Sequence, residues 1–190
     1  MKNEFTKELE KSWEILKKGG IILYPTDTIW GIGCDATNAA AVSKIYKLKK
    51  REESKSMLCL VSDLRMLEKH LEQVPDAAYD IIEYADKPTT IVYDNPVGVA
   101  ENLIADDNSL GIRLVKKGFA FDLVKKFRRP VVSTSANISK FPAPKNFAEI
   151  APEILNGVDY VVNLQSENAS AKPSSIIRLK NDGEVHIIRM

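Results

Sequence analysis

Short apolar runs alternate with helix-like hydrophobic patterns along nearly the whole chain of 190 residues. This alternation restricts the fold more than any other feature, because strands separated by helices are typical of α/β domains. Two apolar runs near the end, residues 174–179 and 185–188, are separated only by a short segment that contains the turn sequence NDG. They predict a β-hairpin, whose strands are antiparallel. The chain is therefore expected to form a mixed β-sheet with flanking helices.

The expected elements follow from the spacing of apolar residues and from residues that cap helices. Strands are expected at residues 21–24, 57–61, 89–93, 110–115, 130–134, 158–163, 174–179 and 185–188. Helices are expected to begin at or next to Thr6, Asn38, Asp63 and Pro75, and at residues 119–127 and 147–155. The pair Gly19-Gly20 is expected to end the first helix.

The composition excludes several classes of protein. A hydrophobic fraction of 44% and a charged fraction of 28% are typical of a globular protein. The length fits one domain, residues 1–190, with no second domain. A net charge of +1 gives no general attraction to nucleic acid or to a membrane. No apolar run approaches a membrane span and the N-terminus does not resemble a signal peptide, so a cytoplasmic location without a membrane partner is expected.

No metal site is expected. Cys34 and Cys59 have no Cys or His neighbours at the spacing of metal ligands. His70 and His186 are isolated in the same way. The chain also contains no G-x-S-x-G nucleophile elbow and no phosphate-binding P-loop.

Residues 24–36, with the sequence YPTDTIWGIGCDA, form the most informative segment. They follow an apolar run and precede the helix expected at Asn38. Such strand-to-helix loops commonly hold anions, because backbone N–H groups at a helix start lack partners. The alternative is a tight turn in which Thr and Asp act only as capping residues.

Two further segments place cations where a ligand could use them. Residues 47–55, KLKKREESK, straddle the end of a helix. Arg51 and Lys55 could clamp phosphates there, or the run could be a solvated face that complements the helix dipole. Arg113 interrupts an apolar strand, residues 109–113. It could bind a ligand carboxylate from a cleft, or reach water from an edge strand.

Two segments offer hydroxyl groups. Residues 133–139, STSANIS, end an apolar strand. Their hydroxyl and amide groups could bind an oxygen-rich ligand at the carboxyl end of that strand, or could simply close the turn. Residues 172–177, KPSSII, place two hydroxyls at the start of another strand and form a weak signal alone.

Taken in this order, the five segments resemble the YrdC/YciO-like family, the threonylcarbamoyl-AMP synthases of tRNA t6A modification. Residues 25–36 match the family motif P-T-[DE]-T-x-[YW]-G-[LI]-x-x-[DN]-A, residues 49–51 match K-x-R, and residues 133–139 resemble S-x-A-N-x-S. Residues 111–113 approximate the R-x-P strand, residues 173–176 approach E-S-T-[IV], and Arg189 resembles the final arginine of the family. The match runs from about residue 20 to residue 189.

The resemblance implies a twisted α/β sheet around a concave, positively lined cavity. It also implies a nucleotidyltransferase that converts L-threonine, bicarbonate and ATP into threonylcarbamoyl-AMP, pyrophosphate and water. By this resemblance threonine binding falls to Thr28, Arg113 and Ser174, and catalysis to Arg51, Lys55 and Arg113. ATP binding falls to Lys49, Arg51, Lys55, Ser109, Ser133, Ser135, Asn137 and Arg189.

ATP is expected as its Mg²⁺ complex, a substrate, with no permanently bound cofactor. Transfer proteins of t6A synthesis, and tRNA or double-stranded RNA, are the partners that the family suggests. Two alternatives remain open at the level of sequence: a YciO-like RNA-binding module without synthase activity, and an ATP-dependent enzyme that acts on another acceptor.

The chain departs from the family pattern mainly around the threonine pocket. Leu60 stands where many synthases carry a histidine, and Glu52 and Ser56 stand at two positions usually held by proline. Lys140 replaces a glycine after residue 139. The usual P-G-P is replaced by KPT at residues 87–89, and the final Pro-Gly is absent. These differences resemble the YciO-like branch.

Overall fold

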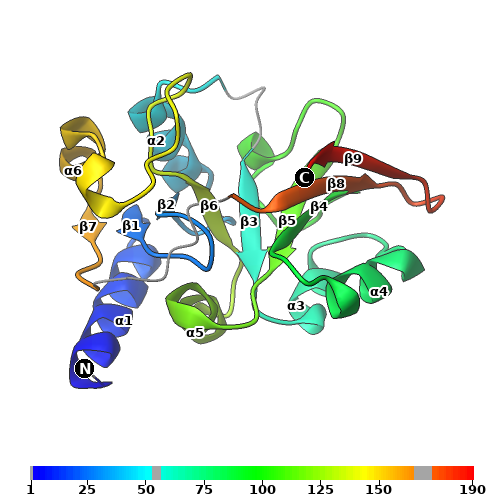
Figure 1. Cartoon of the computed structure of the whole chain (residues 1–190), viewed down its shortest axis with the longest axis horizontal. Coiled ribbons are helices and arrows are strands. Elements are labelled where there is room, and N and C mark those ends of the chain that lie inside the picture. The colour runs from blue at the N-terminus through cyan, green and yellow to red at the C-terminus, as the bar shows by residue number, and fades with distance from the viewer. Residues whose placement is uncertain (1, 53–56, 165–172) are drawn as a thin grey trace.

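A computed structural model describes residues 2–52, 57–164 and 173–190 (Figure 1). Within these ranges nine strands form one sheet, in the order β7-β1-β2-β6-β3-β5-β4-β8-β9. The strands are β1 (Ile22–Tyr24), β2 (Gly31–Gly33), β3 (Leu58–Val61), β4 (Thr89–Asp94), β5 (Ser109–Leu114), β6 (Val131–Ser135), β7 (Tyr160–Val161), β8 (Ser175–Leu179) and β9 (Val185–Arg189).

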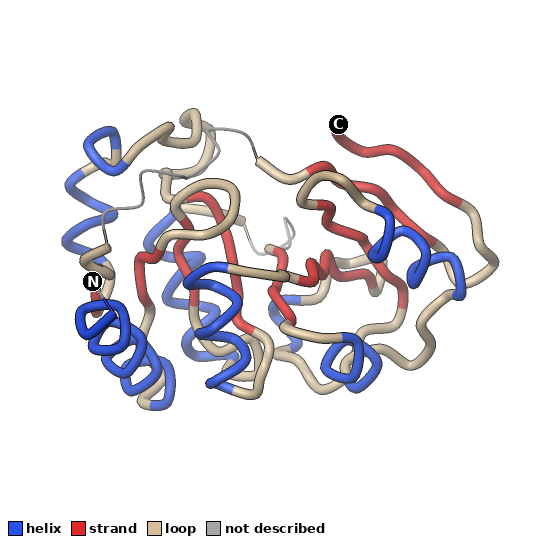
Figure 2. The backbone as a smooth tube through the Cα atoms, turned by 60° about the horizontal axis from the view of Figure 1, so that its bottom comes forward, coloured by secondary structure: helices blue, strands red, loops and turns tan. Residues whose placement is uncertain are grey.

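Helices surround these strands (Figure 2). The α-helices are α1 (Lys2–Lys17), α2 (Ala39–Lys49), α3 (Leu64–Lys69), α4 (Asp76–Tyr84), α5 (Gly118–Phe127) and α6 (Pro152–Gly157). Two short 3₁₀ helices, η1 (Glu101–Leu103) and η2 (Phe147–Glu149), complete the described elements. No helix in the described ranges is both long enough and apolar enough to cross a bilayer.

The sheet is mixed, as the sequence predicts. β3 pairs with β5 and β4 pairs with β8 in parallel, whereas β2–β6, β3–β6, β4–β5 and β8–β9 pair antiparallel. The predicted C-terminal hairpin is confirmed as β8 and β9, drawn in orange and red in Figure 1. Gly183 in its turn has a φ of 87°, a conformation that favours glycine.

Two apolar clusters cover opposite faces of the sheet. Leu23 of β1 packs with the cluster that includes α2, whereas Ile22 and Tyr24 pack with the cluster that includes α1 and α5. This split follows from the strand geometry, in which successive side chains point to opposite faces. α1 and α5 also contact each other through Phe5 and Phe119, whose rings meet edge to face at 5.6 Å.

Several capping predictions are confirmed. The Asn38 side chain accepts a hydrogen bond from the N–H of Ala41, and Asp63 accepts one from the N–H of Met66. Gly19 takes a φ of 73° just beyond the end of α1. The side chains of Asn38 and Asp63 satisfy N–H groups that a helix start otherwise leaves unpaired.

The beginning of α1 was predicted wrongly, because the helix starts at Lys2 and not at Thr6. Its added first turn includes Phe5, which packs against Phe119. Pairing with another helix therefore extends α1 beyond what its local sequence indicates, since most helical stability comes from packing of an apolar face.

Two other elements differ from the sequence prediction. The helix expected at residues 147–155 is divided into η2 and α6, because Pro152 occupies the first turn of α6 and holds Ala151 extended at ψ 141°. The loop expected at residues 24–36 contains β2, which pairs with β1 and β6. A three-residue strand with two glycines has almost no sequence signal, so pairing on both sides is what forms it.

Candidate active site

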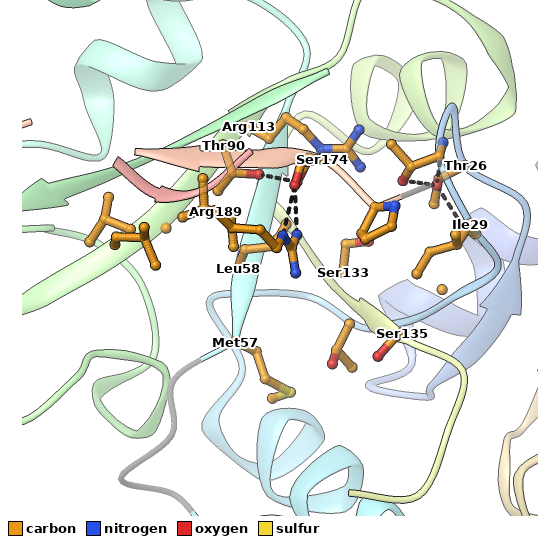
Figure 3. Close-up of a pocket in the computed structure, with 18 of the residues that line it drawn as sticks. Thr26, Ile29, Met57, Leu58, Thr90, Arg113, Ser133, Ser135, Ser174 and Arg189 are labelled. Carbon is orange, nitrogen blue, oxygen red and sulfur yellow. Dashed lines mark hydrogen bonds between the residues drawn. The ribbon is translucent and has the colours of Figure 1, made fainter. Parts of the chain in front are cut away.

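A cavity of about 380 Å³ opens on the face of the sheet that α1 and α5 cover elsewhere (Figure 3). Alternation along the strands explains its position. Leu60 and Val131 pack in the cluster of α5, whereas Leu58 and Ser133, two residues away on the same faces of β3 and β6, line the cavity. The helices therefore cover one part of this face, and the other part is the floor of the cavity.

The described lining is rich in hydroxyl groups and arginines and contains no Asp or Glu. Its polar residues are Thr26, Thr28, Arg51, Thr90, Arg113, Ser133, Thr134, Ser135, Ser174 and Arg189. The apolar residues that line it include Met57, Leu58, Val92, Ile176 and Ile188. A lining of this kind suits an anionic ligand with an apolar part.

Seven of the residues predicted from the sequence meet at this cavity: Thr28, Arg51, Arg113, Ser133, Ser135, Ser174 and Arg189. They come from all five polar segments and from the last strand. Because these segments are far apart in the chain, only the order of the strands brings them together. Figure 3 shows Arg113, Ser133, Ser174 and Arg189 around the same space.

The loop between β1 and β2 is held by its own threonines. The Thr26 hydroxyl donates to the carbonyl of Ile29 at 2.7 Å and accepts from the backbone N–H of Thr28 at 3.1 Å. The hydroxyls of Thr26 and Thr28 lie 2.9 Å apart. The loop is thus a hydrogen-bonded turn, as the alternative interpretation states, and the same turn presents Thr28 to the cavity.

Arg113 is the most buried cation of the lining. Its side chain is 3% exposed, and Nη1 donates to Asp27 Oδ1 at 2.5 Å. Its Nε is buried, and no described residue accepts a hydrogen bond from it. β5 lies between β3 and β4 within the sheet, so the interpretation of Arg113 as an edge-strand residue that reaches water is wrong.

The C-terminal strand is tied to the cavity through Ser174. Arg189 donates from Nε and Nη2 to the carbonyl of Ser174, at 3.1 and 2.6 Å. The hydroxyls of Ser174 and Thr90 lie 2.8 Å apart. These contacts join β9, the start of β8 and β4 at one wall, and Figure 3 draws them as dashed lines.

Lys49 does not line the cavity, so its predicted direct contact with ATP has no support in this geometry. The side chain runs from the end of α2 to the turn after β6, where Nζ donates to the carbonyls of Ser135 and Asn137, the latter at 2.6 Å. Lys49 is 1% exposed. Burial, and secondly the charge of Arg51, lowers the pKa of Lys49 to about 7. Lys49 therefore supports the end of β6, which carries Ser135, and the turn that follows it.

The buried position of Lys49 predicts how stability depends on pH. An unfolded lysine has a pKa of about 10.4, so between about pH 7 and pH 10 the unfolded chain binds more protons than the folded one. The folded state therefore gains stability from this group as pH rises through that window. Lys49→Met removes both the titration and the donor. We measure the free energy of unfolding of both proteins by urea titration. Between pH about 7 and about 9, the value for wild type should rise relative to the value for Lys49→Met. A constant difference would contradict the assignment.

Two other predicted ATP ligands, Ser109 and Asn137, are absent from the described cavity lining. The hydroxyl of Ser109 donates to Asp107 at 2.6 Å, and Asp107 in turn pairs with Arg178 of β8. The side-chain amide of Asn137 donates to the carbonyls of Ile138 and Phe141, at 3.1 and 2.6 Å. For Asn137 the turn-closing reading is correct. Lys55 lies outside the described residues.

The sequence analysis missed Thr26 and Thr90 as lining residues. Thr26 belongs to the first motif, and its neighbour Thr28 was preferred only by resemblance. Thr90 carries the weaker signal, a threonine in a strand rich in β-branched residues, where threonine is common. Leu60 stands where many relatives are expected to carry a histidine. It is fully buried and does not line the cavity. No group of three or more potential metal ligands occurs among the described residues.

Comparison with known proteins identifies the family. A family model named Sua5_yciO_yrdC, described as "Telomere recombination", matches residues 14–190. A Methanocaldococcus jannaschii protein named "Putative threonylcarbamoyl-AMP synthase" is 36% identical over 186 residues, which cover 95% of this chain and 86% of that protein. The "Threonylcarbamoyl-AMP synthase" of Stenotrophomonas maltophilia is 30% identical over 172 residues, which cover 88% of this chain and 91% of that protein.

The fold is also found in solved structures. The crystal structure of P. abyssi Sua5 complexed with L-threonine superimposes with a TM-score of 0.79 at 20% sequence identity. The superposition covers 90% of this chain and 50% of that chain, so the described fold corresponds to about half of the longer protein. The mixed sheet, its flanking helices and the nearly complete match of the family model lead to one conclusion: the chain belongs to the Sua5/YciO/YrdC family.

Proposed function

We propose that the protein is an L-threonylcarbamoyladenylate synthase, a nucleotidyltransferase that converts L-threonine, bicarbonate and MgATP into threonylcarbamoyl-AMP, pyrophosphate and water. The observation that carries this proposal is the convergence of three arginines and several hydroxyls from distant segments on one cavity, whose described lining has no carboxylate. The names of the relatives that cover most of this chain support it. So does the P. abyssi Sua5 structure, whose ligand is L-threonine.

The charges of the cavity suit this reaction. ATP and the carbamate of threonine are both anions and repel each other, so cations between them lower the barrier to their approach. We assign the phosphates to Arg51 and Arg189, with hydroxyl donors from Ser133 and Ser135, and assign the amino-acid carboxylate to Arg113. Arg51 follows α2, whereas Arg113 lies on β5, so the two ligands would be held from different elements.

Positioning is expected to supply much of the rate. The carbamate of threonine is short-lived, and an enzyme must hold it beside the α-phosphorus of ATP in a site with little water. One carbamate oxygen attacks the α-phosphorus, and the bond from that phosphorus to the pyrophosphate oxygen breaks. Because the attacking oxygen is already negatively charged, this step needs no general base. That fits a described lining without Asp or Glu.

Mg²⁺ would enter as part of the substrate. It prefers oxygen ligands and usually keeps several waters while it bridges phosphates. The described lining offers Mg²⁺ hydroxyl oxygens, such as those of Ser133 and Ser135, and no carboxylate. The phosphates and water would therefore supply the other ligands of the ion. We further propose a cytoplasmic enzyme whose product passes to the proteins that complete t6A on tRNA.

The direct test is a synthesis assay. The protein is incubated with ATP, Mg²⁺, bicarbonate and labelled L-threonine, and both threonylcarbamoyl-AMP and pyrophosphate are measured. Formation of both, dependent on bicarbonate, is the expected result. Retained ATP binding without product would overturn the synthase and point to another acceptor. Salt-sensitive RNA binding without ATP binding would point to an RNA-binding module.

A further inference from the structure

Arg113 has an unusually small set of partners for a buried guanidinium. Within the described parts of the chain its one hydrogen bond goes from Nη1 to Asp27 Oδ1, at 2.5 Å. The side chains of Arg113 and Asp27 are 3% and 18% exposed. Nε is buried and has no partner. A buried donor without an acceptor is costly, and Nε is too enclosed to meet a ligand in this arrangement.

The occupied nitrogen matters because the guanidinium has distinct edges. A carboxylate that binds side-on accepts from Nε and Nη2 together, in a planar fork. Asp27 takes Nη1, which lies outside that fork. Because Nε is enclosed by protein, the ion pair leaves Nη2 as the nitrogen that a second carboxylate can reach.

Asp27 holds the arginine from the side away from the cavity. Arg113 lines the cavity of about 380 Å³, whereas Asp27 does not. Asp27 instead lines a smaller pocket of about 170 Å³, together with residues of α4, the start of β4 and the segment before α5. The carboxylate thus compensates the arginine without occupying the space of a ligand.

The surroundings make Asp27 the group that sets the orientation of Arg113. Leu60 is the register partner of Arg113 on β3, and it is apolar and fully buried. Asp27 itself sits between Thr26 and Thr28, whose hydrogen bonds fix the backbone on both sides of it. A rigid loop therefore presents the carboxylate, and a long side chain with several rotamers is held by it.

We infer that Asp27 is a positioning residue for the substrate carboxylate. It fixes Nη1 of Arg113 so that Nη2 is presented to the carboxylate of the amino acid. This inference rests on the proposed function and adds a residue that acts through Arg113 without contact to the substrate. Preorganisation of this kind reduces the entropy that binding would otherwise cost.

The test is a comparison of L-threonine binding by calorimetry and of pyrophosphate release in wild type, Asp27→Ala and Asp27→Asn. We expect Asp27→Ala to weaken L-threonine binding and to raise its KM by about tenfold or more, the order found when a supporting residue is lost. The KM for ATP should stay within about twofold, because the phosphate side uses other residues. Asp27→Asn keeps an acceptor oxygen for Nη1 and should restore most of the affinity.

A second readout separates positioning from a general structural role. Wild type should bind L-threonine better than L-threoninamide, which lacks the carboxylate, and Asp27→Ala should reduce this preference as strongly as Arg113→Lys does. Asp94→Ala is the matched control, since Asp94 pairs with Arg178 at 2.8 Å and does not line the cavity. It should leave the preference unchanged.

Three outcomes would overturn the inference. The first is unchanged L-threonine affinity in Asp27→Ala, and the second is tighter binding, which would mean that Asp27 competes with the substrate for Arg113. The third is an equal loss for L-threonine and L-threoninamide. Wild type that binds L-threonine but releases no pyrophosphate refutes the proposed function alone, and the binding data still test Asp27. Wild type that binds no L-threonine refutes both.

Discussion

Arg113→Leu should reduce kcat/KM for L-threonine by about 100-fold, because a charge-assisted hydrogen bond from Nη2, of about 1.5–3 kcal/mol, is lost. Arg113→Lys should lose about tenfold, since lysine keeps the charge but has no planar group that bonds Asp27 and the substrate from two fixed nitrogens. The order of the two losses is the informative result. It is measured by pyrophosphate release at varied L-threonine and saturating ATP.

Removal of Arg113 also leaves Asp27 without its partner, so folding must be checked separately. Arg178→Lys is the matched control, because Arg178 forms a comparable ion-pair network with Asp94 and Asp107 on the same sheet, outside the cavity lining. It should leave the L-threonine KM unchanged. If Arg113→Lys retained full activity in a folded protein, the planar guanidinium would have no role in recognition.

The second large effect is expected for ATP. Arg51→Ala should raise the KM for ATP by about 100-fold, the loss expected for one or two charge-assisted contacts to phosphate. Arg51 is half-buried at the cavity, beyond the end of α2. Thermal unfolding should change little. The measurement is ATP affinity by calorimetry, together with kinetics at saturating L-threonine.

Lys50 provides the control that distinguishes a phosphate clamp from a solvated charge run. It is the adjacent cation, is exposed, and does not line the cavity. If the run is only a solvated face, Lys50→Gln and Arg51→Ala should have similar effects on ATP affinity. A loss of ATP affinity that occurs in Arg51→Ala and not in Lys50→Gln supports the phosphate clamp. Equal ATP affinities of the two variants would exclude the clamp.

The local elements were largely predictable from the sequence. Asn38 and Asp63 were recognised as caps because their side chains can bond backbone N–H groups of the first helical turn. The C-terminal hairpin followed from two apolar runs around a turn. These features depend on residues within a few positions of one another, so the order of residues along the chain is sufficient to find them.

Features that depend on distant partners were not predictable in this way. β2 exists because β1 and β6 lie on either side of it, and the first turn of α1 packs Phe5 against Phe119 of α5. The residues of β6 that pair with β2, and Phe119 of α5, each lie more than a hundred residues further along the chain than their partners. A glycine-rich triplet and an N-terminal turn carry too little local preference to reveal such contacts.

The sequence by itself determined the α/β class, the sites of most helices and strands, and the five segments whose chemistry resembles one family. Only the tertiary structure decided which side chains of those segments share a cavity. Arg51 and Lys49 are two residues apart, yet Arg51 lines the cavity and Lys49 is buried against the turn after β6. The motif of residues 25–36 likewise contributes Thr28 to the cavity and Asp27 to Arg113 from the other side. The reason is physical: side-chain direction is set by packing against elements that are distant in the chain, and residue type alone does not encode it.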